Sequence, residues 1–257
     1  MAGPDTTEFP EPRNLALALE SRRPLTPMLA RLRLIGDDLS GFHHLPGQDL
    51  MLAVPTATDP GVTINRRYTI RRYDPAASAV DVDIVLHGDG PGARWARDAA
   101  PGSPIDAVGP RGKIVPDPAA EWHLFACDES GWAATAAMAE ALPADRTALV
   151  FAEIDGPQER QPLTTDAALT VEWVERGGRS PGDPAPLADA IRAAVGAGAL
   201  PGGSGHAYLS AEFSVVRGLA DLLGGAGGLS SDQISPKAYW RLGRANAPHG
   251  EPPRELS

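Results

Sequence analysis

Four arginines lie within seven residues of one short stretch, NRRYTIRRYD at residues 65–74. Tyr68, Thr69 and Tyr73 stand between them, and aromatic and β-branched residues favour a strand. Side chains alternate along a strand, so Arg66 and Tyr68 share one face. The stretch offers a cation for a phosphate, a ring for a planar group, and at Thr69 a small hydrogen-bonding side chain. A flavin dinucleotide needs these partners, although a solvated basic strand with core tyrosines would have the same residues.

A second stretch could hold the rest of such a cofactor. VLHGDGPGARWA begins at Val85 and combines a strand end, a His-Gly turn and the start of a helix. His87 and the amides after it could bind a diphosphate or a ribose, and the helix start around Ala93 could bind phosphates. Gly92 permits close approach of the backbone. The alternatives are an ordinary surface histidine at His87 and a core anchor at Trp95.

The elements that carry these stretches change in type along the chain. Short strands separated by turn residues are predicted at 28–36, 48–55, 66–73, 79–88 and 101–112, which indicates an antiparallel sheet or barrel. From residue 121 strands alternate with helices, which indicates a parallel α/β sheet. Strands are predicted at 121–128, 146–155, 169–176, 206–211 and 233–243, and helices at 131–142, 186–197 and 212–223. We therefore predict two domains, at 15–118 and 119–244, with loose termini at 1–14 and 245–257.

Composition narrows the class of protein. The 257 residues carry a formal net charge of -10, which argues against nucleic acid as a partner. A single cysteine excludes an internal disulfide and fits a reducing compartment. The N-terminus does not resemble a signal peptide, and no apolar run approaches the roughly 20 residues of a spanning helix. We expect a soluble cytoplasmic protein without membrane insertion.

The order of several motifs resembles that of the siderophore-interacting family of flavoproteins, the ferric-siderophore reductases. The matching stretches are LTPMLARLRLIGDDLSGF, PGQDLMLAVP, RRYTIRRYD, VDIVLHGDGPGARWA, AVGPRGK, WHLFACDES and KAYWRLGR, over roughly residues 24–244. The resemblance implies a ferredoxin-reductase-like architecture, with an FAD-binding six-stranded barrel before an α/β domain that binds NADPH or NADH. It also implies the flavin contacts, which are Arg66, Tyr68, Thr69, Val85, His87, Gly92, Ala93 and Trp95.

The resemblance places the nicotinamide contacts on two motifs, where this chain departs from the family. The family's Gly-Asp-Glu motif has Cys127 in place of its glycine and Trp132 shortly after it, and the later Gly-Glu motif has Ala211 and then Phe213. Each change adds bulk where a nucleotide would approach the backbone. The two aromatic residues could stack on an organic substrate, fill part of the pocket, or point away. The nicotinamide contacts implied by the motifs are Asp128, Glu129, Ser130 and Glu212.

The chemistry that the resemblance implies is the reduction of a bound ferric siderophore. This reaction needs no catalytic acid from the protein, and we predict no resident metal site. An anionic chelate needs a local basic patch in an acidic protein. Lys237 and Arg241 are four residues apart, and the odd-even rule places them on one face of the last strand. Tyr239 or Trp240 could cover the flavin, or pack in the core. The further patch candidates are Arg71, Arg72 and Arg244.

Two other classes of function stay open. One is a flavoprotein of the same fold recruited to a biosynthetic reaction on an organic substrate, without nicotinamide. The other is a non-catalytic protein that binds an iron chelate. The aromatic residues Trp132 and Phe213 motivate the first of these alternatives.

Overall fold

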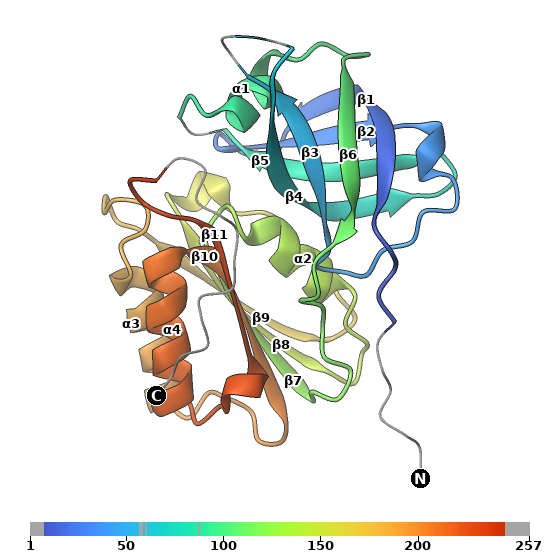
Figure 1. Ribbon diagram of the computed structural model, residues 1–257. Helices are drawn as coiled ribbons and strands as arrows, with labels where there is room; N and C mark the ends of the chain where they lie inside the picture. The colour runs from blue at the N-terminus through green and yellow to red at the C-terminus, as the bar shows by residue number, and fades with distance from the viewer. Residues whose placement is uncertain (1–7, 57–58, 60, 87, 245–257) are drawn as a thin grey trace.

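The structure of the protein is a computed structural model, and it describes residues 8–56, 59, 61–86 and 88–244. A barrel formed by the first half of the chain sits above a sheet formed by the second half (Figure 1). The last barrel strand ends at Arg111 and the first strand of the sheet begins at Trp122. The predicted loose segment at 245–257 lies outside the described residues.

The first domain is a closed barrel of six antiparallel strands in the order β1-β2-β5-β4-β3-β6. Leucine, isoleucine and valine side chains from all six strands fill its interior. The strands are β1 Arg13–Pro24, β2 Leu29–Ile35, β3 Asp49–Pro55, β4 Thr63–Asp74, β5 Ala79–Val85 and β6 Pro104–Arg111, with η1 Asp37–Leu39 and α1 Pro91–Asp98 between them. The predicted antiparallel barrel is confirmed.

One barrel strand was not predicted. β1 begins at Arg13, so the predicted loose segment 1–14 is wrong at its last two residues. The sequence held the signal, because Leu15, Leu17 and Leu19 alternate and all three are buried in the core. The second half of β1 is exposed and lacks this alternation.

β5 is buried on both of its faces. Val80 and Val82 face the barrel core, while Asp81 and Asp83 on the other face are also covered. The Arg31 guanidinium donates two hydrogen bonds to the Asp83 carboxylate, at 2.7 and 2.8 Å. Valine and aspartate alternate along β5, and this alternation separates core residues from ion-paired residues rather than core from solvent.

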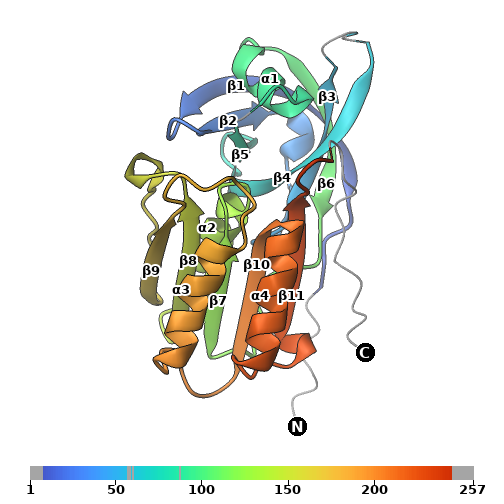
Figure 2. The same ribbon diagram turned by 90° about the vertical axis from the view of Figure 1, so that its left-hand side faces the viewer.

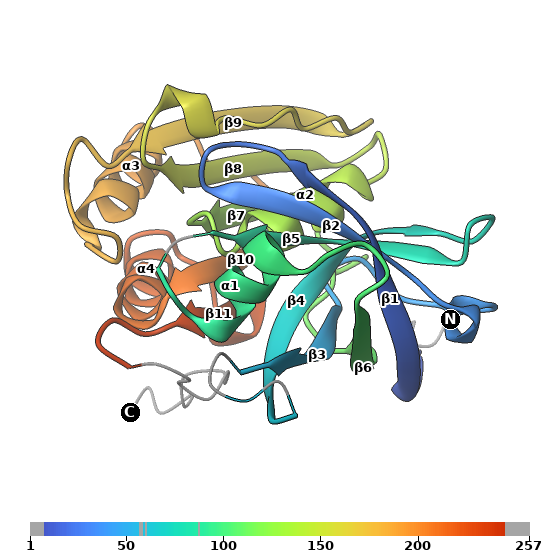
Figure 3. The ribbon, with the colours of Figure 1, turned by 90° about the horizontal axis from the view of Figure 1, so that it is seen from above.

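The second domain is a five-stranded parallel sheet in the order β11-β10-β7-β8-β9. Helices α3 and α4 cover one face, while α2 covers the face turned toward the barrel (Figures 2 and 3). The elements are β7 Trp122–Cys127, α2 Trp132–Glu140, β8 Thr147–Ile154, η2 Pro157–Glu159, β9 Ala168–Glu175, α3 Ala185–Gly196, β10 Gly205–Glu212, α4 Phe213–Gly225, η3 Ser231–Gln233 and β11 Ile234–Trp240. This confirms the predicted parallel α/β sheet.

Among the described residues, the polar contacts that join the two domains include three that involve a carboxylate. Each contact pairs one barrel residue with one residue of the α/β domain, and every carboxylate involved is buried or partly buried. The pairs are Arg71 with Glu140 at 2.6 Å, Asp49 with Lys237 at 3.2 Å, and Thr26 with Glu159. No helix among the described residues is long and apolar enough to cross a membrane.

Candidate active site

The basic strand lines a cleft between the two domains. Arg66, Tyr68 and Thr69 of β4 form its barrel wall, and Val85 extends that wall at the end of β5. The opposite wall comes from Ser130, Ala133 and Tyr239 of the α/β domain, and the cavity volume is about 160 Å³. Residues more than 100 positions apart in the sequence thus enclose one space. The structure brings the three residues of the R-x-Y-T motif together there.

Tyr68 is held in place by the helix that follows β5. A Cβ atom on Gly92 would lie 1.9 Å from the Tyr68 hydroxyl, so only glycine leaves room for this ring. The same position is 3.9 Å from Arg66 Cγ, which places the start of α1 beside both motif residues. Burial raises the pKa of Tyr68 to about 12, and its hydroxyl therefore stays protonated at neutral pH.

These residues fit FAD. An arginine and the start of a helix lie side by side, which is the combination that binds phosphate. Tyr68 and Thr69 follow on the same strand, with a ring and a hydroxyl at the cleft. Trp95 packs in the barrel core, which agrees with its alternative role as a core anchor, and Ala93 is also buried. His87 lies outside the described residues.

The last strand closes the cleft from the other side. The hydroxyl oxygen of Tyr239 lies 3.3 Å from that of Thr69, so the side chains of β11 and β4 meet across the domain interface. Lys237 stands 5.0 Å above the Tyr239 ring and 3.2 Å from the Asp49 carboxylate. Asp49 also accepts two hydrogen bonds from Arg67. The charge of Lys237 is therefore paired inside the interface.

The predicted basic patch is not one surface. β11 ends at Trp240 after an irregularity in its pairing with β10, so Arg241 does not continue the strand face of Lys237. The Arg241 guanidinium lies 4.6 Å above the Phe213 ring, while Trp240 donates to Asp128 at 2.7 Å. The expectation that Lys237 and Arg241 share a strand face is wrong. Of the further candidates, Arg71 pairs with Glu140, whereas Arg72 and Arg244 are exposed.

Asp128 ties together the ends of three strands. Its Oδ1 accepts hydrogen bonds from the backbone and hydroxyl of Ser130 and from Gly131 N, and its Oδ2 accepts from Glu212 N and Trp240 Nε1. Burial raises the pKa of this carboxyl, while the hydrogen bonds from Ser130 and Trp240 oppose that shift. A Cβ on Gly131 would lie 1.9 Å from the Ser210 carbonyl oxygen, so this turn requires glycine.

The other two motif carboxylates also bind the protein itself. Glu212 caps α4 by accepting hydrogen bonds from Ser214 and Val215, and it accepts one from Leu242 N at 3.0 Å. Burial raises its pKa, but these hydrogen bonds outweigh burial and leave the pKa below its usual value. Glu129 forms an ion pair with Arg176 at 2.5 Å. The side chains of both motifs thus stabilise the carboxyl edge of the sheet.

Three of the four departures from the family motifs lie in the cores that flank the sheet. Cys127, Trp132 and Ala211 are each at most 4% exposed and lie in the two cores that flank the sheet. Burial raises the pKa of the Cys127 thiol, which makes it an inert core residue. Trp132 packs on Trp173 with their ring centroids 4.9 Å apart. Both aromatic residues thus have partners within the protein, since the Phe213 ring lies under the Arg241 guanidinium.

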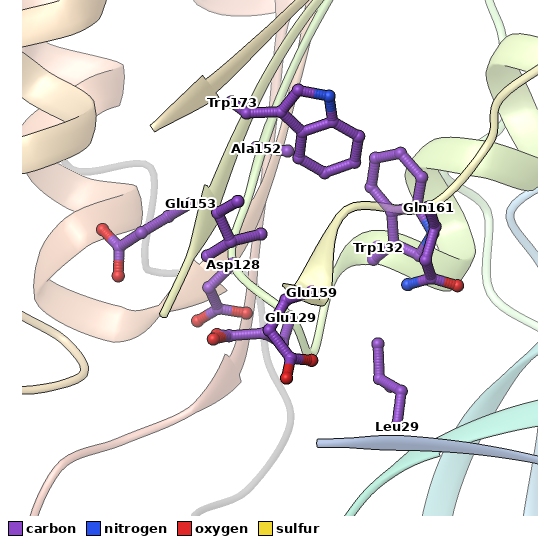
Figure 4. A pocket seen from close by; sticks show the side chains of 10 residues that line it. Leu29, Asp128, Glu129, Trp132, Ala152, Glu153, Glu159, Gln161 and Trp173 are labelled. Carbon is purple, nitrogen blue, oxygen red and sulfur yellow. The ribbon is translucent and has the colours of Figure 1, made fainter. Parts of the chain in front are cut away.

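A second, much smaller cavity lies where β7 and β8 end. Figure 4 shows the carboxylates of Asp128, Glu129 and Glu159 near one another below the Trp132 and Trp173 rings. The cavity volume is about 10 Å³, which is the room for one water molecule. Among the described residues, no group of three or more potential ligands could hold a metal ion.

Sequence reasoning missed the ion-pair cluster beside this cavity. Arg176 follows the end of β9, and its guanidinium contacts Glu129, Glu153 and Asp155 at 2.5, 3.3 and 3.5 Å. Burial raises the pKa of Glu153 to about 7, although Arg176 acts in the opposite direction. Charged residues at the ends of predicted parallel strands were the available signal, because such ends meet at one edge.

Comparison with known proteins places this geometry in a family. The model described as "Siderophore-interacting protein" matches residues 120–243, and that described as "Siderophore-interacting FAD-binding domain" matches residues 53–114. The chain belongs to the siderophore-interacting protein family. The family, the FAD cofactor and the class of flavin-dependent oxidoreductase predicted from the sequence are confirmed, and NAD(P)H is supported as the second cofactor.

Individual relatives span most of the chain. The uncharacterized protein Rv2895c of Mycobacterium tuberculosis is 40% identical over 206 residues, which cover 76% of this chain and 70% of that protein. The ferric vibriobactin reductase ViuB of Vibrio cholerae is 29% identical over 239 residues, 84% of this chain and 85% of that one. A siderophore utilization protein from T. fusca has a similar structure, with a TM-score of 0.84, 27% identity, and coverage of 94% of this chain and 98% of that one.

Proposed function

We propose that this chain is a cytoplasmic reductase that releases iron from ferric siderophores, using FAD and NAD(P)H. The observation that carries the proposal is the position of the cleft. Its barrel wall holds the flavin-type motif, and its other wall begins at the carboxyl edge of the parallel sheet, where α/β domains bind nucleotides. The name of the relative ViuB supports a ferric chelate as the substrate.

The residues of the barrel wall have separable roles. Arg66 and the start of α1 would hold the phosphates, because a guanidinium and free helix amides both bind anions. Tyr68 would pack against the ring system, and Thr69 would offer its hydroxyl at the ring edge. Bound FAD would link a two-electron donor, the nicotinamide nucleotide, to the one-electron reduction of ferric ion. Tyr239 limits access to this space through its contact with Thr69.

Iron release requires little from the protein beyond electrons and access. Siderophore oxygens are hard ligands that prefer the ferric ion, and the ferrous ion lies low in the affinity series for divalent metals. Reduction therefore weakens the chelate without an acid group from the protein. Arg66 and Arg67 at the cleft could attract an anionic chelate locally, although Arg67 is already paired with Asp49.

An anaerobic absorbance titration tests the proposal. FAD-loaded protein is titrated first with NADPH or NADH and then with ferric catecholate and ferric hydroxamate chelates, while a chromogenic chelator reports ferrous ion. We expect the flavin absorbance to bleach with the nucleotide and to return in proportion to the ferrous ion formed. Flavin that stays reduced after the ferric chelates are added would refute the proposed substrate. Protein carrying Arg66→Ala with Tyr68→Ala is the control for flavin free in solution.

A further inference from the structure

The position of the cleft sets the direction in which a nicotinamide nucleotide crosses the sheet, provided that the proposed reductase function holds. The nicotinamide end must reach the cleft beside Ser130, in the turn after β7, and Tyr239 of β11. The sheet continues from β7 to β8 and β9. Neighbouring strands are about 4.8 Å apart, so the end of β9 lies roughly 10 Å from that of β7. The adenosine half therefore extends over the ends of β8 and β9.

This part of the edge carries more carboxylates than cations. Arg176, with its side chain only 2% exposed, is surrounded by Glu129, Glu153 and Asp155. The buried Glu153 Oε2 has no hydrogen-bond partner, so Arg176 does not satisfy this carboxylate completely. Asp155 is the accessible member of the cluster, with its side chain 55% exposed. Even with Glu153 partly protonated near pH 7, one cation faces the carboxylates of Glu129 and Asp155 as well, which leaves a local excess of negative charge.

The two other arginines near these strand ends are also engaged. Arg160 pairs with Glu175 at 3.0 Å, and Arg179 pairs with Asp183 at 3.2 Å. Each of these ion pairs adds no net charge to the edge. Arg160 and Arg179 are exposed, but each already has a carboxylate partner, and Arg176 could reach a 2′-phosphate only by leaving its buried partners. Separating a buried ion pair is costly, because it leaves an uncompensated charge.

We propose that this chain selects NADH over NADPH, with Asp155 as the residue that determines the choice. In α/β nucleotide-binding domains a carboxylate at this edge accepts a hydrogen bond from the ribose 2′-hydroxyl, whereas an available arginine accommodates a 2′-phosphate. A carboxylate can only accept hydrogen bonds, so it favours the hydroxyl and repels the phosphate. Arg176 is buried, whereas Arg160 and Arg179 are exposed but each paired with a carboxylate. Asp155 is the accessible carboxylate of the Arg176 cluster.

Calorimetric titration of the FAD-loaded protein with NAD⁺ and with NADP⁺ measures the choice directly, beside the rates of flavin reduction by NADH and NADPH. A hydrogen bond to a charged group contributes about 1.5–3 kcal/mol, so we expect at least a tenfold preference for the nucleotide without the phosphate. In Asp155→Ala the affinity for NAD⁺ should fall about tenfold while that for NADP⁺ rises, and the preference should disappear.

Glu172→Ala is the matched control, because Glu172 is an exposed carboxylate in the middle of β9, away from the carboxyl ends of the strands. The Glu172→Ala variant should prefer NAD⁺ over NADP⁺ to the same extent as the unmodified protein. Equal affinities, a preference for NADP⁺, or an unchanged preference in Asp155→Ala would overturn the inference while the reductase function stands. If neither nucleotide binds or reduces the flavin, both the inference and the nicotinamide step of the proposed function are refuted.

Discussion

The two walls of the cleft use their motif residues in different ways. On the barrel wall, Arg66, Tyr68 and Thr69 face the space between the domains. At the carboxyl edge of the sheet, Asp128 and Glu212 instead accept hydrogen bonds from the loops and helix that they support. On β4 the backbone groups are satisfied by pairing with β3, so neighbouring side chains can line the cavity. Strand ends must first satisfy their own backbone groups.

The largest effect should come from the barrel wall. In Arg66→Ala with Tyr68→Ala, the affinity for FAD should fall about a thousandfold, because a charge-assisted hydrogen bond and an aromatic contact together contribute roughly 4 kcal/mol. Reconstitution of apoprotein, followed by flavin absorbance, measures this. Arg72→Ala is the control, since Arg72 is exposed on the same strand. Full flavin occupancy in the double variant would show that the site is elsewhere.

Loss of Asp128 should affect stability more than flavin affinity. Asp128→Ala leaves several buried donors without an acceptor, and we expect unfolding in urea to become easier by on the order of 3 kcal/mol. The affinity for FAD should change by less than about tenfold. Asp145→Ala, at a side chain 71% exposed, should leave the free energy of unfolding almost unchanged. A variant as stable as the unmodified protein would mean that Asp128 does not tie the strand ends together.

Glu153 predicts a pH dependence of the carboxyl edge. Burial raises its pKa to about 7 in the folded protein, against the usual 4.5. Between these values the folded state holds a proton that the unfolded state has lost, so the contribution of Glu153 to stability decreases as the pH rises from 4.5 through 7. We compare the free energy of unfolding of Glu153→Gln with that of the unmodified protein at each pH. This difference should favour the variant by on the order of 2 kcal/mol more at pH 8 than at pH 4.5. Urea unfolding at both pH values measures this difference, and Glu172→Gln is the control. An equal difference at pH 4.5 and pH 8 would contradict the raised pKa of Glu153.

The smallest effect should come from the motif cysteine. Cys127→Ala removes a buried sulfur, so the free energy of unfolding should fall by about 1 kcal/mol. The KM for NADH should stay within about twofold, because this side chain faces α2 and not the carboxyl edge. Steady-state reduction of a ferric chelate at varied NADH concentration measures the KM. A severalfold change in KM at intact stability would place Cys127 in the nucleotide site.

Much of the architecture was predictable from local patterns. The short strands separated by turn residues, and the change to strand-helix repeats after residue 121, correctly predicted a barrel and a parallel sheet. β1 was missed although its three leucines alternate. The flavin motif was also local, since an arginine and a tyrosine two positions apart on a strand necessarily share a face.

The carboxyl edge was not predictable in this way, because its contacts join strands that are distant in the sequence. The last strand shows the limit. The odd-even rule places Lys237 with Tyr239, and they do lie together, but the rule fails at Arg241 because β11 ends one residue before it. The charges at the strand ends were visible in the sequence, but no local pattern indicated that Arg176 would be buried among three carboxylates.

The sequence by itself determined the two domains, the order of their elements and the residues that one strand presents on one face. These features depend on hydrophobic periodicity and on neighbours within a few positions. Only the tertiary structure decided which charges remain available to a ligand. Lys237 is neutralised by a carboxylate 188 positions away, and Asp128 is held by the ends of two other strands. Ion pairing and burial depend on distances in space, and those distances exist only once each domain has folded and the two have packed against each other.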